Sequence, residues 1–358
     1  MDHERILLPE ALKEQDYAAG FFGKWHLIPR PRPLDLGNKN LLVKIAAMHP
    51  EHMPKKHGFD ENFGGDHSAN QGRNFFYPKY HKFAGLKGKG NKDECLTDVL
   101  TSCAVDFMER RKNEPFFLYL SYYTVHGPIT GKPDYVKKYL KKLADNPNAD
   151  YYMTSPGKAA MIQSLDESVG RVMAKLNEID QFENTLIIFT GDNGSQGDEF
   201  VPHFRGNKGT AYEGGTRVPL IVAGPRIETG VCDVPTIGMD LYPMILSYLN
   251  APLKPEEHLD GVDILPLLTG KGTIKNRPLY WHYPHYHGST WAPGAAIRDG
   301  DWKLIEFYHY GGYELYNLRE DPGERNNLAK QYPDRAKGLL HKLHLWQKEL
   351  GAKMPVAP

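Results

Sequence analysis

Asp192 and Asn193 are the residues of this chain whose types and spacing first suggest chemistry. They follow a run of β-forming residues, 185–189, and precede a glycine. A carboxylate beside an amide carbonyl offers hard oxygen ligands of the kind that Ca²⁺ or Mg²⁺ prefers. Taken alone, the stretch favours the simpler interpretation of an Asp-Asn-Gly turn that ends a strand. The metal-site hypothesis gains weight because similar arrangements recur in the chain.

Two other apolar runs end in groups that can carry protons or charge. Lys24 and His26 follow the run 17–22, and His126 follows the run 116–121. If these runs are parallel strands, their carboxyl ends meet at one edge of the sheet. We therefore expect one shared site rather than three unrelated loops.

A glycine-rich segment, 206–216, supplies a further cation. Its glycines allow the backbone to approach a ligand closely, and Lys208 would present a compact positive charge to an anion. Glu213 and Arg217 are four residues apart, which favours a structural ion pair behind this loop.

Together these groups predict binding of a tetrahedral anionic ester. Lys24 and Lys208 would hold the anion beside a hard metal ion, and His26 and His126 would act as general acid and base.

The elements needed to position these residues form an α/β pattern. Expected helices and strands alternate along the chain, which predicts a mostly parallel sheet sandwiched by helices. The helices lie near 6–15, 96–108, 162–176 and 241–249, and the strands near 17–22, 116–121, 185–189 and 218–223. The run 187–189 does not alternate, so we expect that strand to be buried on both faces. From about residue 275, short aromatic runs predict a small antiparallel sheet followed by a helix at 334–349.

The bulk composition is that of an ordinary globular protein of about two domains. Lys plus Arg and Asp plus Glu both total 44, so the formal net charge is zero, which argues against a nucleic-acid or membrane-surface partner. No apolar run approaches the roughly 20 residues needed to cross a bilayer. Three cysteines fit neither a disulfide framework nor a zinc site, and Cys95 and Cys103 are expected to be small core residues.

Several motifs in a fixed order resemble the sulfatase family of the alkaline phosphatase superfamily. They are Gly-Lys-Trp-His-Leu at 23–27, Val-His-Gly-Pro at 125–128, Phe-Thr-Gly-Asp-Asn-Gly at 189–194, the loop 206–219, and later segments at 239–243, 259–268, 298–305 and 314–324. The resemblance covers essentially the whole chain. It implies an alkaline phosphatase-like fold, with a catalytic α/β domain at 1–274 and a C-terminal α+β subdomain at 275–358.

The resemblance also implies a role for each matching residue. Asp192 and Asn193 resemble the family's Ca²⁺ ligands, and Lys24 and Lys208 its sulfate-binding lysines. His26 resembles the histidine that acts on the formylglycine hydrate. His126 resembles the one that assists the leaving alcohol. Asp240, Asp260 and Asp263 are assigned to caps and turns.

The chain departs from the family in one respect that bears on activity. It contains no Cys or Ser in a C-x-P-x-R-like motif, so formylglycine modification is not possible in this chain, and the family's N-terminal aspartate pair is absent. We therefore expect a truncated sulfatase that lacks its first strand and nucleophile, is inactive alone and binds Ca²⁺ weakly or not at all. The alternatives are a non-catalytic protein that binds sulfated glycans and a phosphate ester hydrolase of the same superfamily.

The expected substrate is a small-molecule or glycan sulfate ester. Trp281, His285 and His287, with His67, could line the pocket mouth, since aromatic and imidazole rings suit sugar rings, although a plain sheet core and surface loop explain them equally well. The N-terminus has no signal-peptide core, and members of this family are usually exported or lysosomal, so localisation stays open. Oligomeric state is likewise open.

Overall fold

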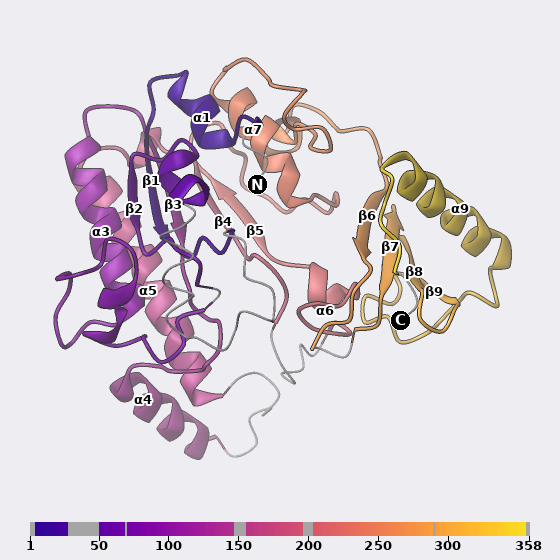
Figure 1. Ribbon diagram of the computed structural model, residues 1–358, viewed down its shortest axis with the longest axis horizontal. Helices are drawn as coiled ribbons and strands as arrows, with labels where there is room; N and C mark the ends of the chain where they lie inside the picture. Colours follow the sequence, from indigo (N-terminus) through magenta and orange to yellow (C-terminus); the bar gives the residue numbers. More distant parts are fainter. Residues whose placement is uncertain are drawn as a thin grey trace. The chain divides into compact units, whose positions relative to one another are not determined.

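A computed structural model describes residues 4–27, 50–68, 70–146, 155–195, 203–288 and 291–355. Its contacts divide these residues into two compact units (Figure 1). The first unit takes its described residues from 1–149, 155–185 and 239–262. The second takes them from 186–238 and 263–358. This division differs from a boundary at residue 274, because the segment 186–238 makes its contacts with the C-terminal part of the chain.

The first unit is built on a three-stranded parallel sheet in the order β2-β1-β3. The strands are β1 (Ala18–Gly23), β2 (Glu61–Phe63) and β3 (Phe116–Ser121). β1 lies in the middle, pairs in parallel with both neighbours, and all six of its residues are buried. A central strand covered on both faces needs apolar or small residues throughout, and its sequence Ala-Ala-Gly-Phe-Phe-Gly meets that need.

Helices cover both faces of this sheet. On one face α3 (Leu96–Arg111) packs against Phe22 of β1, and α5 (Pro156–Glu178) contributes Met161 to the same core. On the other face α1 (Leu8–Lys13) and α7 (Leu241–Tyr248) pack together against Phe117 of β3. α4 (Pro133–Ala144) lies against α5 and has no buried residue. The predicted layers of helix, parallel sheet and helix are therefore present in this unit.

The second unit contains two antiparallel sheets. β4 (Ile187–Thr190) pairs with β5 (Leu220–Ala223), and α6 (Glu213–Thr216) precedes β5. The second sheet has the order β6-β7-β8-β9, with bounds Leu279–Tyr283, Gly294–Asp299, Trp302–Phe307 and Tyr313–Asn317. α9 (Pro333–Glu349) packs on one face of this sheet through Leu339 and Leu343. The predicted C-terminal antiparallel sheet and helix are confirmed.

Two details of the strand that precedes Asp192 differ from expectation. The expectation that 187–189 is buried on both faces is wrong, because Phe189 is 37% exposed and both isoleucines are only half-buried. β4 is also antiparallel to its partner β5 rather than part of a parallel sheet. A strand with a single partner in a two-stranded sheet keeps more of its surface in solvent than a central strand does.

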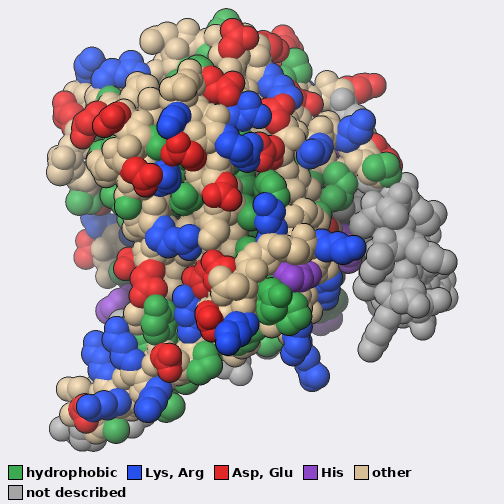
Figure 2. Space-filling view, turned by 90° about the vertical axis from the view of Figure 1, so that its left-hand side faces the viewer, with side chains coloured by type: hydrophobic (Ala, Val, Ile, Leu, Met, Phe, Trp, Pro, Cys, Tyr) green, Lys and Arg blue, Asp and Glu red, His purple; other side chains and the backbone are tan. Residues whose placement is uncertain are grey.

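The surface that Figure 2 shows carries Lys and Arg side chains mixed with Asp and Glu side chains, in agreement with a formal net charge of zero. Among the described residues no helix is long and apolar enough to cross a membrane.

Candidate functional site

Lys24 follows directly on β1, and a glycine sets the direction in which the chain leaves the strand. Gly23 has a φ of +116°, and a Cβ there would lie 1.8 Å from the carbonyl oxygen of Ser121. Only glycine allows this approach. It lets the backbone N–H of Lys24 donate to that carbonyl at 2.7 Å, while the Ser121 hydroxyl donates to the Lys24 carbonyl at 2.9 Å. Lys24 is thereby fixed beside the end of β3.

His26 is held by the segment that follows β2. Its backbone N–H donates to the Asp66 carbonyl at 3.2 Å, and its φ of +54° turns the chain at this point. The intervening Trp25 anchors the segment, because its indole N–H donates to the His52 carbonyl at 2.7 Å and its ring meets Phe21 edge-on at 5.0 Å. The Gly-Lys-Trp-His motif is therefore a turn whose tryptophan is an anchor.

His126 lies beyond the end of β3, the third strand of the parallel sheet. Its backbone N–H donates to the Tyr123 carbonyl at 2.9 Å, and the hydroxyl of Tyr123 donates to the Gly64 carbonyl, just after β2, at 3.0 Å. The segments that follow the three parallel strands are thus tied to one another. Lys24 and His26 follow β1, His67 follows β2 and His126 follows β3, so all four come after the carboxyl ends of the parallel strands in the first unit. A site shared by them stays a prediction.

Lys208 and Asn193 line a pocket that belongs to the second unit alone. The pocket has a volume of about 300 Å³ and is bounded on one side by the segment 208–216. The backbone N–H of Lys208 donates to the Ser195 carbonyl at 2.7 Å. Because Ser195 is two residues after Asn193, this bond holds Lys208 close to Asn193. Gly209 has a φ of +90°, and a Cβ there would lie 2.2 Å from Nδ1 of His287. The glycine therefore lets this imidazole pack directly on the Lys208 loop.

The other wall of the pocket is aromatic. Trp281 and Tyr283 from β6, together with His287 and Trp291, line it. Trp281 and His287, two of the residues suggested for substrate binding, line this pocket, and their contact with substrate stays a prediction. His285 is exposed beside Tyr283, at 5.5 Å between ring centroids, and is not among the lining residues. A lysine and several aromatic rings that line one pocket suit an anionic ester carried on a ring-shaped group.

A buried charge cluster fastens the segment 208–216 to the C-terminal sheet. Nζ of Lys303, on β8, lies 2.9 Å from Glu213 and 3.1 Å from Glu324, and all three side chains are at most 3% exposed. Glu324 also accepts the backbone N–H of Glu213 at 2.6 Å. Burial raises the pKa of the Glu324 carboxyl, although Lys303 opposes that rise. The expected pair of Glu213 with Arg217 is present at 3.8 Å, but Lys303 is the closer partner.

The donor set at Asp192 and Asn193 does not by itself make a calcium site. Asp192 is exposed, and the amide of Asn193 donates to the Gly194 carbonyl at 2.9 Å. Ca²⁺ takes six to eight oxygen ligands. Within the described ranges no group of three or more His, Cys, Asp or Glu side chains could hold a metal ion. These residues do not fit the ion on their own.

The aspartates assigned to structure behave accordingly where their contacts are described. Asp240 is buried and accepts the backbone N–H of Val262 at 3.0 Å, and Asp263 accepts that of Leu265 at 2.8 Å. Cys95 and Cys103 are buried in the core beside α3, as expected.

Sequence reasoning missed two residues of the site regions, Gln71 and Trp291. Gln71 lies in the segment after β2 and is fully buried, and Trp291 closes the aromatic wall. No local pattern singled them out, because each is surrounded by loop residues. A buried glutamine in a glycine-rich loop becomes visible only once its partners are known.

Comparison with known proteins decides the family. A sequence model described as Sulfatase matches residues 2–251, which is more than half of the chain. The chain belongs to the sulfatase family. A second model, described as N-sulphoglucosamine sulphohydrolase, C-terminal, matches residues 203–349. The resemblance drawn from the Lys-Trp-His, His-Gly-Pro and Asp-Asn-Gly motifs is therefore confirmed.

Individual relatives agree with this assignment. A sulfatase of Formosa agariphila is 34% identical over 284 residues, covering 70% of this chain and 50% of the relative. An N-acetylgalactosamine-6-O-sulfatase of Bacteroides thetaiotaomicron is 25% identical over 405 residues, covering 93% and 75%. The crystal structure of Ps i-CgsB has a TM-score of 0.74 at 26% identity, covering 96% of this chain and 74% of that one. It has also been solved in complex with k-i-k-neocarrahexaose.

The chain is shorter than these relatives. It spans about half the length of the Formosa sulfatase and 46% of a mouse steryl-sulfatase that is 27% identical over 303 residues.

Proposed function

We propose that this sulfatase chain binds sulfate esters of carbohydrates, and that the protein to which it corresponds hydrolyses them. The observation that carries the proposal is the pocket of the second unit, which Lys208 and Asn193 line together with Trp281 and Trp291. The lysine would bind the sulfate group, and the aromatic wall would take the sugar ring. The named activity of the Bacteroides relative and the k-i-k-neocarrahexaose ligand of Ps i-CgsB support this substrate class.

We further propose that hydrolysis itself needs groups that this chain does not carry. The 358 residues contain no C-x-P-x-R motif from which formylglycine could form. The resemblance implies a formylglycine hydrate as the nucleophile of the family. Lys208 would hold the anion in its own pocket. Lys24, His26 and His126 keep the roles that the resemblance implies, which are anion binding, base and return of a proton to the leaving alcohol. The chain alone is expected to bind without turnover, and to bind Ca²⁺ weakly or not at all.

The test compares binding of N-acetylgalactosamine 6-sulfate, its 6-phosphate and the unmodified sugar by isothermal titration. We expect the sulfate to bind best and the unmodified sugar not to bind measurably. Lys208→Ala removes a hydrogen bond to a charged group, worth about 1.5–3 kcal/mol, and should weaken binding about 10- to 100-fold. Lys271→Ala is the matched control, because Lys271 is exposed in the same unit and does not line the pocket.

Three outcomes would contradict parts of the proposal. Equal binding by the sulfated and unmodified sugars would remove Lys208 from any anion-binding role. A preference for the phosphate would favour the phosphate ester hydrolase instead. Release of free sulfate by the isolated chain would show that the expected inactivity is wrong.

A further inference from the structure

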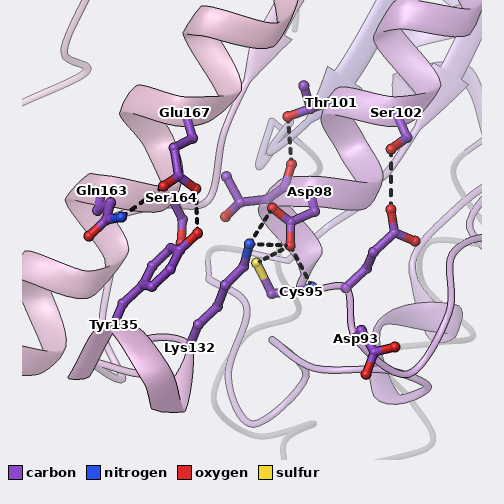
Figure 3. Close-up of polar contacts among 12 residues, drawn as sticks. Asp93, Cys95, Asp98, Thr101, Ser102, Lys132, Tyr135, Gln163, Ser164 and Glu167 are labelled. Carbon is purple, nitrogen blue, oxygen red and sulfur yellow. Dashed lines mark hydrogen bonds and ion pairs between the residues drawn. The ribbon is translucent and has the colours of Figure 1, made fainter. Parts of the chain in front are cut away.

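The segment 124–132, which carries His126, is fastened at both ends to the first turn of α3. At its start the hydroxyl of Thr124 lies 2.6 Å from that of Thr97. At its end Nζ of Lys132 lies 2.9 Å from the Asp98 carboxylate, which also accepts the backbone N–H of Cys95 at 3.0 Å. Figure 3 shows Lys132 and Cys95 converging on Asp98. The two ends of the segment therefore cannot shift without breaking partly buried polar contacts.

Between these ends the side chain of Gln71 forms hydrogen bonds with the middle of the segment 124–132. The amide nitrogen of Gln71 donates to the carbonyl of His126 and, at 3.2 Å, to that of Pro128. Gln71 is fully buried, and its amide oxygen has no hydrogen-bond partner among the described residues. Burying an amide oxygen without a partner is unfavourable. The cost of burying this oxygen offsets part of the stability gained from the two hydrogen bonds of Gln71. A buried side chain with little net effect on stability points to a role in fixing the geometry of the two carbonyls.

The carbonyl between those two, that of Gly127, sets the protonation pattern of the His126 ring. It lies 2.8 Å from Nδ1 of His126. A carbonyl can only accept, so Nδ1 must be the donor. The neutral ring is then the Nδ1–H tautomer, and Nε2 is the atom at which the ring gains or gives its exchangeable proton.

We propose that Gln71 is a positioning residue that sets the tautomer of His126. By holding the carbonyls on either side of Gly127, it keeps the Gly127 carbonyl against Nδ1 and reserves Nε2 for proton transfer. This inference rests on the proposed function in one respect: the proton transfer at Nε2 has a purpose only if the protein hydrolyses an ester. The imidazolium gives its Nε2 proton to the leaving alkoxide oxygen, an O–H bond forms, and the ring remains as the neutral Nδ1–H tautomer.

The experiment reads the tautomer directly in the full chain. Histidine side chains are labelled with ¹⁵N, and long-range ¹H–¹⁵N spectra are recorded about two pH units above the usual imidazole pKa of about 6.5. The His126 signals are assigned by their loss in His126→Gln. We expect the wild type to show the Nδ1–H tautomer. Gln71→Met, which keeps the shape but cannot donate, should move the ring towards the Nε2–H form that a solvated imidazole prefers.

Matched variants separate positioning from general loosening. Gln347 is also buried and donates to the hydroxyl of Tyr308 at 2.6 Å in the second unit, so Gln347→Met should leave the His126 tautomer unchanged. Thr97→Val removes the hydroxyl that meets Thr124, whereas Thr97→Ser keeps it. We expect the valine variant to shift the tautomer and the serine variant to restore it, which provides a test even where Gln71→Met does not fold.

An unchanged Nδ1–H tautomer in a folded Gln71→Met variant would overturn the proposal. So would an equal effect of Thr97→Val and Thr97→Ser. The proposed function is tested separately by sugar sulfate binding at Lys208, in the other unit. Failure of that binding with the tautomer shift intact would remove the proposed function and leave the positioning of His126 standing.

Discussion

Removal of Lys303 should strongly destabilise this protein, because its charge is buried between two carboxylates. Its Nζ lies 2.9 Å from Glu213 and 3.1 Å from Glu324, and its side chain is 0% exposed. The guanidinium groups of Arg298 and Arg217 stand 3.7 and 3.8 Å from the other oxygen of Glu213. In Lys303→Met the volume of the side chain is nearly kept, but both carboxylates lose their closest cation.

The size of the effect follows from the burial. Removing one partner of a buried ion pair typically costs about 3–5 kcal/mol, because the remaining charge is left without compensation. We expect that loss in the free energy of unfolding of Lys303→Met at neutral pH. Neutralising the partners as well, in Lys303→Met with Glu213→Gln and Glu324→Gln, should recover most of it. Lys342→Met is the control: Lys342 is 53% exposed and pairs with Asp299 on the surface, which is worth about 1 kcal/mol or less.

The same variant has a characteristic dependence on pH. Burial already raises the pKa of Glu324, and loss of Lys303 removes a charge that opposes the rise. A carboxyl whose pKa is higher in the folded state binds more protons there, so its contribution to stability is greatest below its unfolded pKa and is lost as the pH rises through its folded pKa. The deficit of Lys303→Met should therefore shrink as the pH is lowered from 7 towards 4.5, the ordinary pKa of a glutamate.

The assay is urea unfolding of the full chain, followed by tryptophan fluorescence, which includes Trp281 and Trp291 in the affected unit. The reasoning would be refuted by a loss below about 1 kcal/mol at pH 7. It would also be refuted by a triple variant no more stable than Lys303→Met, or by a deficit that does not change with pH.

Two further predictions concern the pocket loop and the cysteines. Gly209→Ala should destabilise the protein by more than about 1 kcal/mol and weaken sugar sulfate binding. The reason is that Gly209 has a φ of +90° and that a Cβ there would overlap the ring of His287. Gly288→Ala is the control and should do neither, because there is open space around Gly288. Burial raises the pKa of the Cys95 thiol to about 12 and that of Cys103 to about 11, whereas Cys232 is exposed. A thiol reagent at pH 8 should therefore modify only Cys232 in the native protein, and modification of all three before unfolding would contradict the described core.

The sequence determined the elements and the family because both depend on local order along the chain. The strand 116–121 and the helix beginning at Leu96 appear where apolar periodicity placed them. The Lys-Trp-His, His-Gly-Pro and Asp-Asn-Gly motifs identified the sulfatase family without any coordinates. Such motifs can be recognised in the amino-acid sequence alone, because the turn after a strand is set by glycines and polar residues that are neighbours along the chain.

The pairing of strands could not be obtained in the same way. An apolar run predicts that a strand is buried, but it does not predict which strand pairs with it or whether the pairing is parallel or antiparallel. β4 was expected in a parallel sheet and is instead antiparallel to β5, so Phe189 stays exposed. A shared site that joins the residues after β4 to those after β1 and β3 stays a prediction.

Only the tertiary structure revealed the side chains that hold the site residues in place. Gln71 reaches His126 across 55 positions of sequence, and Lys303 reaches Glu213 across 90. Nothing in the chain near either residue marks it, because a buried polar group is defined by the partner that compensates it, and that partner comes from another element. The sequence thus named the groups that could bind and transfer a proton, and the fold decided what positions them.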